Sequence, residues 1–326
     1  MKPEQFLAKR NAASDAIHER WDADNAQWWN WYLSLAYAEA SPAGPVDTPE
    51  LPDLADLSLD ALQAELAIPY PVPETARQAF QRDGYVKLPE VCSPAALLTL
   101  RRSFDRLFSI SLENAPPLGF PSLEMMWTTD PVCRAFVLSP RLAGIAAALL
   151  EVRSVRLYHD NALSKLPGAG RTPWHYDAHH YPIASKHVAT LWAPLQPTPP
   201  AMGPLAFAKA MDAWQLVKDL PFSKFDDSYD RGIAEALREA KVPVEASGFA
   251  LGEVSFHHTH SLHTAGPNHT TLPRMALATT YLEDGARLVD EPTLISGDFE
   301  KFMPGVGPGD PISSPLNPVL YPTETP

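Results

Sequence analysis

The first part of the chain repeats apolar positions at the spacing of a helix. Phe6, Ala13, Ile17 and Trp21 are separated by seven, four and four residues, so they fall on one face of a helix predicted over residues 1–38. A strongly aromatic run follows Trp21 within this segment. We expect these aromatic side chains to pack on the rest of the protein or to form a wall over a substrate pocket.

Proline-rich stretches then interrupt the helical pattern and indicate where the main domain begins. Residues 41–57 contain many Pro and Asp residues and predict an irregular connection. A helix is predicted over 58–67, and the prolines at alternate positions after it enforce an extended segment. We therefore expect an N-terminal extension at 1–75 and a main domain at 76–326.

Helical patterns return and continue to residue 150. A helix that ends in a turn at Gly84 is followed by a short strand over Tyr85–Leu88. A second helix is predicted to begin at Ser93, because a residue type that caps helices stands there directly before Pro94. The apolar stretch 130–150 predicts one more helix.

After residue 150 the pattern changes to short apolar runs that are separated by Pro and Gly. Four of these runs are Ser154–Tyr158, His187–Trp192, Gly252–His257 and Arg274–Tyr281. Such spacing is typical of an antiparallel β sandwich or barrel. The mostly polar segment 211–247 predicts a helical insertion between strands, and the Pro-rich chain from Gly285 onward is expected to wrap the surface.

The composition excludes some classes of protein. With 45% hydrophobic residues among 326, the chain can bury a sizeable core. Its formal net charge is -13, from 26 Lys and Arg against 39 Asp and Glu. Proteins that bind nucleic acids gain affinity by neutralising phosphates with Lys and Arg, so no nucleic-acid partner is expected.

Cysteine usage and the absence of long apolar runs indicate the compartment. The two cysteines, Cys92 and Cys133, exclude a four-cysteine zinc site and are expected to be buried thiols. The charged N-terminus resembles no signal peptide, and no run of 18 apolar residues predicts a membrane span. We expect a cytoplasmic protein that binds no membrane, and the sequence leaves its oligomeric state open.

The segment Thr172-Pro173-Trp174-His175-Tyr176-Asp177 carries a candidate metal site. Residues i and i+2 of a strand point to the same face, so His175 and Asp177 can reach one metal ion. An imidazole and a carboxylate are two of the three ligands that hold reactive Fe(II) in facial-triad oxygenases. Alone, this short pattern is weak evidence, because it arises often by chance.

A second histidine and an arginine further along the chain complete the constellation. His263 lies 86 residues after Asp177, so a third ligand would come from a distant strand. Arg274 follows His263 by 11 residues and begins a run in which Ala276, Ala278 and Thr280 share its face. A face of small residues headed by Arg leaves room for a bound anion, and a guanidinium can hold a carboxylate through two parallel hydrogen bonds.

Together these motifs resemble the phytanoyl-CoA dioxygenase family. The chain contains K-x-P-G-x-G-x-T-P-W-H-x-D, then H-T-A-G-P-N, with an Arg 11 residues beyond the second motif's His. The family's opening is similar to Ala79-Phe80-Gln81-Arg82-Asp83-Gly84-Tyr85-Val86-Lys87-Leu88-Pro89. The resemblance spans roughly residues 76–284 and implies a double-stranded β-helix, or jelly roll: an all-β core flanked by helices.

The resemblance also implies a cofactor, a co-substrate and the residues that bind them. His175, Asp177 and His263 would ligate Fe(II), which reacts with O2 and 2-oxoglutarate. Arg274 would hold the distal carboxylate of 2-oxoglutarate. Further co-substrate contacts are implied for two residues that match family positions, Trp192 and Asn161.

Two departures from the family pattern affect the expected pocket. Ala265 stands two residues after the distal His, where the family often has Ser, so a hydroxyl contact is missing. A family Lys expected upstream has no counterpart in Glu124-Met125-Met126-Trp127. This second replacement argues against assuming an acyl-CoA substrate.

Several other side chains near the motifs could be mistaken for ligands. His179 and His180 follow the first motif too closely to join the same metal cleanly, and one of them is a candidate for contacting substrate. Tyr181 is a candidate pocket wall. An alternating strand that ends at His263 would place His258 and His260 away from the iron.

The predicted function is an Fe(II)- and 2-oxoglutarate-dependent dioxygenase that oxidises, most simply by hydroxylation, a small organic molecule, as in natural-product tailoring. One alternative is a zinc-dependent hydrolase that uses the same three ligands and a bound water. Arg274 and the lack of an H-E-x-x-H motif count against it. The other is a non-catalytic cupin-like binding protein, against which the complete ligand set counts.

Overall fold

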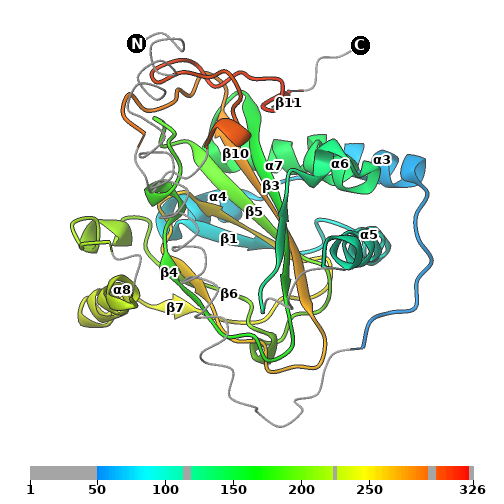
Figure 1. Cartoon of the computed structure of the whole chain (residues 1–326), viewed down its shortest axis with the longest axis horizontal. Helices are drawn as coiled ribbons and strands as arrows, with labels where there is room; N and C mark the ends of the chain where they lie inside the picture. Colours follow the sequence, from blue (N-terminus) through cyan, green and yellow to red (C-terminus); the bar gives the residue numbers. More distant parts are fainter. Residues whose placement is uncertain (1–49, 113–118, 223–225, 293–298, 323–326) are drawn as a thin grey trace.

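The core of the protein is built from two antiparallel β-sheets with helices on the outside (Figure 1). The computed structural model describes residues 50–112, 119–222, 226–292 and 299–322. The helix that the sequence predicts over 1–38 lies outside these ranges.

Within the described ranges, the larger sheet has seven strands and the smaller has four. In spatial order the larger contains β1 (Tyr85–Leu88), β8 (Val254–His258), β5 (Val188–Pro194), β10 (Arg274–Glu283), β3 (Val155–Lys165) and β11 (Val319–Tyr321), with β2 (Ser122–Glu124) also paired to β3. The smaller contains β4 (Thr172–His175), β9 (His263–Ala265), β6 (Leu205–Ala208) and β7 (Val244–Glu245). Antiparallel strands that are far apart in sequence lie side by side in both sheets. The prediction of an all-β core with the jelly-roll architecture is confirmed.

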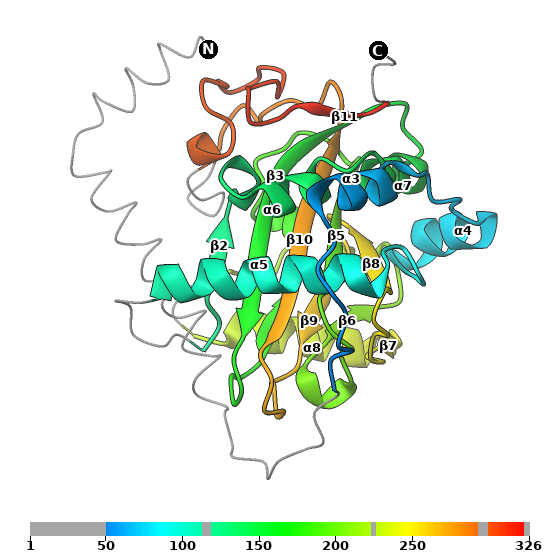
Figure 2. The same ribbon diagram turned by 90° about the vertical axis from the view of Figure 1, so that its right-hand side faces the viewer.

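Helices cover the outer face of the larger sheet, and α5 lies across β3, β10 and β5 (Figure 2). They are α3 (Leu59–Ala67), α4 (Glu74–Asp83), α5 (Pro94–Leu112), α6 (Pro131–Val137) and α7 (Pro140–Leu150). One more helix, α8 (Ser228–Glu239), packs beside β4 of the smaller sheet. Short 3-10 helices are η1 (Met126–Thr128), η2 (Asp177–His179), η3 (Pro200–Met202), η4 (Ala213–Leu216) and η6 (Phe299–Lys301). Helix α8 lies within the segment 211–247, and the end of that segment pairs with β6 as β7.

The prediction of a single helix over 130–150 is wrong, because this stretch forms α6 and α7. Ser139 is the N-cap of α7, and its hydroxyl accepts a hydrogen bond from the backbone nitrogen of Leu142 at 3.2 Å. Pro140 has no backbone N–H to continue the first helix, whereas it fits the first turn of the second. Pro131–Leu150 has the length and composition of a membrane span, but 61% of its most apolar window is buried inside the protein.

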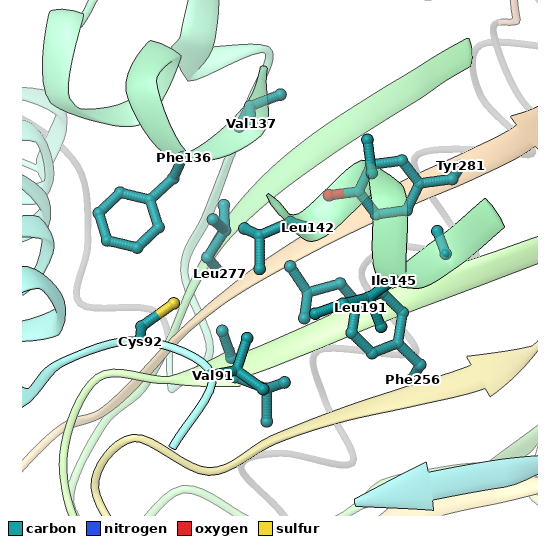
Figure 3. Packing of buried hydrophobic residues seen from close by; sticks show 14 of the residues in the cluster. Val91, Cys92, Phe136, Val137, Leu142, Ile145, Leu191, Phe256, Leu277 and Tyr281 are labelled. Atoms are coloured by element: carbon teal, nitrogen blue, oxygen red, sulfur yellow. The ribbon is translucent and has the colours of Figure 1, made fainter. Parts of the chain in front are cut away.

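Alternation along the strands separates the core from the inner space of the jelly roll. Met275, Leu277 and Tyr281 of β10 belong to the main hydrophobic core beneath the helices. In Figure 3, Leu277 and Tyr281 lie among side chains of β5, β8, α6 and α7. Arg274 and Ala278 of the same strand instead line a cavity between the sheets. Because the outer face is fully packed, the inward positions can carry polar groups for function.

A buried carboxyl group on β3 gives a test of this packing. Asp160 has no exposed surface, and its Oδ2 accepts a hydrogen bond from the backbone nitrogen of Met126 at 3.0 Å. Burial raises the pKa of Asp160 from 3.8 to about 7. The folded protein therefore keeps a proton between pH 4 and 7 that the unfolded chain releases, so this group lowers the free energy of unfolding as pH rises, by up to about 1.4 kcal/mol per pH unit.

Asp160→Asn is expected to remove this contribution, because its amide is neutral at every pH and its oxygen can still accept from Met126. Urea denaturation at pH 5 and pH 8 would measure it. The variant should gain stability relative to the unmodified protein on going from pH 5 to pH 8. Asp219→Asn, at an exposed position, is the matched control. The same difference in unfolding free energy at both pH values would contradict the expectation.

Candidate active site

The structure brings His175, Asp177 and His263 together in the inner space between the two sheets. His175 ends β4 and is the register partner of His263, which begins β9. Asp177 begins η2, directly after this strand. Its Oδ1 lies 4.0 Å from Nε2 of His175 and 3.8 Å from Nε2 of His263. One potential ligand atom from each residue lies within 4.8 Å of the other two, a spacing that suits a single metal ion.

Both histidines are held with the same ring nitrogen facing the shared space. Nδ1 of His175 lies 2.8 Å from the carbonyl oxygen of Pro173, and Nδ1 of His263 lies 3.0 Å from that of Ser261. A carbonyl oxygen can only accept, so each Nδ1 carries the proton and each Nε2 has a free lone pair. Burial lowers the pKa of both rings, which favours the neutral form that binds metals.

The two carboxylate oxygens of Asp177 lie in different surroundings. Oδ1 faces the two histidines, whereas Oδ2 accepts a hydrogen bond from the hydroxyl of Thr190 at 3.0 Å. Nε2 of His257 lies 3.3 Å from the same Oδ2. Burial alone would raise the pKa of Asp177, but the His257 contact and the neighbouring His263 hold it well below its usual value. The group is therefore an anion.

His257 belongs to no sequence motif, and only the alternation of its strand indicated its direction. Phe256 points into the hydrophobic core, so His257 beside it points to the inner space. His258 instead places Nε2 2.6 Å from the carbonyl oxygen of Lys186, and His260 stacks on Trp214. Neither of these two residues lines the cavity, as predicted.

A cavity of about 260 Å³ contains the triad and extends to Arg274. Arg274 is 1% exposed, and its Nη1 donates to the carbonyl oxygen of Gly203 at 2.8 Å. Gly203 has a φ of +69°, and a Cβ there would lie 2.2 Å from the carbonyl oxygen of Gly266, so only glycine permits this close packing. The loop after β9 and the loop before β6 therefore meet beside the guanidinium.

A second buried basic side chain and a buried hydrogen-bond donor accompany Arg274. Lys165 is the register partner of Arg274, and its Nζ donates to Gly266 and Thr172. Burial, and then the charge of Arg274, lowers the pKa of Lys165 well below its usual value. The ring of Trp192 lies 5.3 Å from the guanidinium carbon, and its buried Nε1 has no hydrogen-bond partner within the described ranges. This part of the cavity suits an anion that also accepts a hydrogen bond.

The remaining predicted co-substrate residue also lines the cavity. Asn161 of β3 stands opposite Glu124 of β2, and both side chains face the cavity. Ala265 lines the cavity as well, so the hydroxyl that the family often has there is replaced by a methyl group. Glu124 forms an ion pair with Lys301, which lies in η6. All six predicted site residues are thus brought to one cavity.

Sequence comparison decides the family. The model for phytanoyl-CoA dioxygenase (PhyH) matches residues 80–276, which is more than half of the chain. The chain belongs to this family. As a member of this family, the protein is a non-haem iron oxygenase that uses 2-oxoglutarate and O2. No curated protein sequence matches the chain significantly.

Solved structures share the fold of this dioxygenase. SnoK, the α-ketoglutarate-dependent carbocyclase from nogalamycin biosynthesis, is 22% identical with a TM-score of 0.63, covering 77% of this chain and 99% of SnoK. The epimerase SnoN, solved with Fe3+, α-ketoglutarate and nogalamycin RO, is 23% identical with a TM-score of 0.61, covering 76% and 98%. EctD from S. alaskensis, solved with 2-oxoglutarate and 5-hydroxyectoine, is 17% identical with a TM-score of 0.57, covering 76% and 90%. At these identities the similarity establishes the jelly-roll fold.

The other side of the dioxygenase's cavity is walled mainly by aromatic side chains. Tyr181, the candidate pocket wall, lines it, and of the neighbouring pair His179 and His180 it is His180 that does so. The segment 211–247 adds Phe222 and Tyr229, whose rings lie 5.2 Å apart. These two could not be predicted from the sequence, because the segment that carries them has no alternating strand pattern to show which side chains turn inward.

Proposed function

We propose that this dioxygenase oxidises a small organic molecule at iron held by His175, Asp177 and His263, with 2-oxoglutarate bound at Arg274. The observation that carries the proposal is the convergence of both Nε2 atoms and Oδ1 at one end of a cavity that also contains a buried guanidinium. A zinc hydrolase would need the triad but has no evident use for Arg274.

The residues present fit both the metal and the co-substrate. Two neutral imidazoles and one carboxylate leave coordination positions open for 2-oxoglutarate and O2. Bound iron would couple the oxidative decarboxylation of 2-oxoglutarate, to succinate and CO2, to oxidation of the substrate. Arg274 binds the distal carboxylate and so orients the co-substrate, while the indole N–H of Trp192 can donate a hydrogen bond to it.

The rest of the cavity supports a substrate with apolar surface. Tyr181, Phe222 and Tyr229 offer ring faces and edges, which pack well against cyclic or unsaturated carbon skeletons. Hydroxylation in natural-product tailoring is the reaction we propose, and SnoK and SnoN, which share the fold, come from nogalamycin biosynthesis.

The compartment we propose is the cytoplasm. Cys92 and Cys133 are free and buried. Burial raises the pKa of Cys92 to about 12 and that of Cys133 further, so both thiols stay protonated. Unoxidised structural thiols are usual in a reducing compartment.

Anaerobic titration with Fe(II) and 2-oxoglutarate tests the proposal. A visible charge-transfer band is expected when the keto acid chelates the iron. His263→Ala should abolish the band, and His269→Ala, whose imidazole lies outside the cavity, should retain it. If the unmodified protein gave no band, the assignment of an Fe(II) and 2-oxoglutarate site to this cavity would be overturned.

A further inference from the structure

A row of three hydroxyl groups leads from the cavity wall to the carboxylate of Asp177. The hydroxyl oxygen of Tyr181 lies 3.3 Å from Oγ1 of Thr280, which lies 3.0 Å from Oγ1 of Thr190. The Thr190 hydroxyl reaches Oδ2 of Asp177 at 3.0 Å. Thr190 and Thr280 are register partners on β5 and β10, and both are buried. The row is therefore attached to the two central strands of the larger sheet.

The direction of every hydrogen bond in this row follows from the carboxylate at its inner end. The ionised carboxylate of Asp177 can only accept, so Thr190 donates its single hydroxyl proton to Oδ2. Thr190 must then accept from Thr280, and Thr280 must accept from Tyr181. Hydrogen bonds that point the same way polarise one another, so the outer bonds strengthen the one to the carboxylate.

The backbone closes this row into a ring. The backbone nitrogen of Tyr181 donates to the carbonyl oxygen of Asp177 at 3.0 Å. Asp177 is thus held by its own turn on one side and by Thr190 on the other. With Thr190 and His257 both at Oδ2, the oxygen that remains directed at His175 and His263 is Oδ1.

We infer that Tyr181, Thr280 and Thr190 are positioning residues that keep Asp177 a ligand through Oδ1 alone. The inference rests on the proposed iron site. Without the hydrogen bond at Oδ2, the carboxylate could rotate or bind through both oxygens, which would occupy a position that 2-oxoglutarate or O2 needs. Partners of this kind behind a ligand typically change metal affinity by about 10- to 100-fold when they are removed.

Metal binding by purified variants tests the inference without turnover. Anaerobic calorimetry gives the Kd for Fe(II), and the visible spectrum of bound Co(II) reports the coordination number. Thr190→Val, which keeps the shape but lacks the hydroxyl, should weaken binding by roughly 10- to 100-fold and change the Co(II) spectrum. Thr190→Ser should restore both, which separates the hydroxyl from packing.

The outer end of the row has its own matched pair of variants. Tyr181→Phe should shift the Kd in the same direction by a smaller factor, because it removes only the polarising bond. Tyr158→Phe is the control, since its ring packs 5.1 Å from that of Tyr181 while its hydroxyl is outside the row. It should leave the Kd unchanged.

The outcomes distinguish failure of the proposed iron site from failure of the positioning role. If the unmodified protein binds neither Fe(II) nor Co(II), the proposed iron site fails. If it binds both, and Thr190→Val binds with the same Kd and spectrum, the iron site stands and the positioning role is overturned. Circular dichroism of each variant confirms that it is folded before metal is added.

Discussion

Arg274→Ala is expected to weaken 2-oxoglutarate binding by roughly 30-fold to several thousand-fold while leaving Fe(II) affinity nearly unchanged. The guanidinium is buried beside Trp192 and lines the same cavity as the triad. Removing one partner of a buried charge pair costs about 2–5 kcal/mol, which gives this range of affinity.

The charge-transfer band provides the measurement for this variant. Its dependence on 2-oxoglutarate concentration gives the Kd at a fixed, saturating concentration of Fe(II). Arg287→Ala is a matched control, because this arginine is exposed, does not line the cavity, and donates from Nη1 to the carbonyl oxygen of Gly309. A change of less than threefold for Arg274→Ala would show that the distal carboxylate binds elsewhere.

Asp177→Asn is expected to abolish 2-oxoglutarate decarboxylation and to weaken Fe(II) binding by more than roughly 100-fold. Loss of a residue that hydrogen-bonds to a metal ligand already weakens metal binding by about 10- to 100-fold. This change removes the negative charge of the ligand itself. The amide has the same shape, so the fold should persist. The NH2 group of the new Asn would also face the hydroxyl of Thr190 and Nε2 of His257, which are hydrogen-bond donors to the carboxylate in the unmodified protein.

Succinate formation and the iron content after desalting measure the two effects. Asp284→Asn is a suitable control, because this carboxylate pairs with Arg156 outside the cavity. Full iron content in Asp177→Asn would mean that another carboxylate serves as the ligand. Glu124 and Asp230 are the other acidic residues that line the cavity, and they would be the next to replace.

The parts of the site that the sequence predicts are those that depend on local spacing. His175 ends β4 and Asp177 begins η2 two residues later, and the register of β4 with β9 places His263 opposite His175. Trp192 and Asn161 were indicated by resemblance to the family rather than by a pattern. Both line the cavity.

The hydrogen bonds around Asp177 could not be predicted in the same way. Thr190 meets His257 and Thr280 across strands, and these neighbours are 67 and 90 residues away along the chain. A single sequence carries no signal for such register. The division between α6 and α7 is different, because Ser139 followed by Pro140 is a recognisable helix start inside an apolar run.

Helix α8 also covers one edge of the smaller sheet. Strand β4 is at one edge of that sheet, where an unpaired backbone N–H could template the addition of another chain. The carboxylate of Asp230 instead accepts from the backbone nitrogen of Trp174 at 2.7 Å, so a helix side chain satisfies the edge. At the opposite edge, β7 is only Val244–Glu245, too short to recruit a partner strand. The sheet that carries both histidines is thereby protected from edge-to-edge aggregation on both sides.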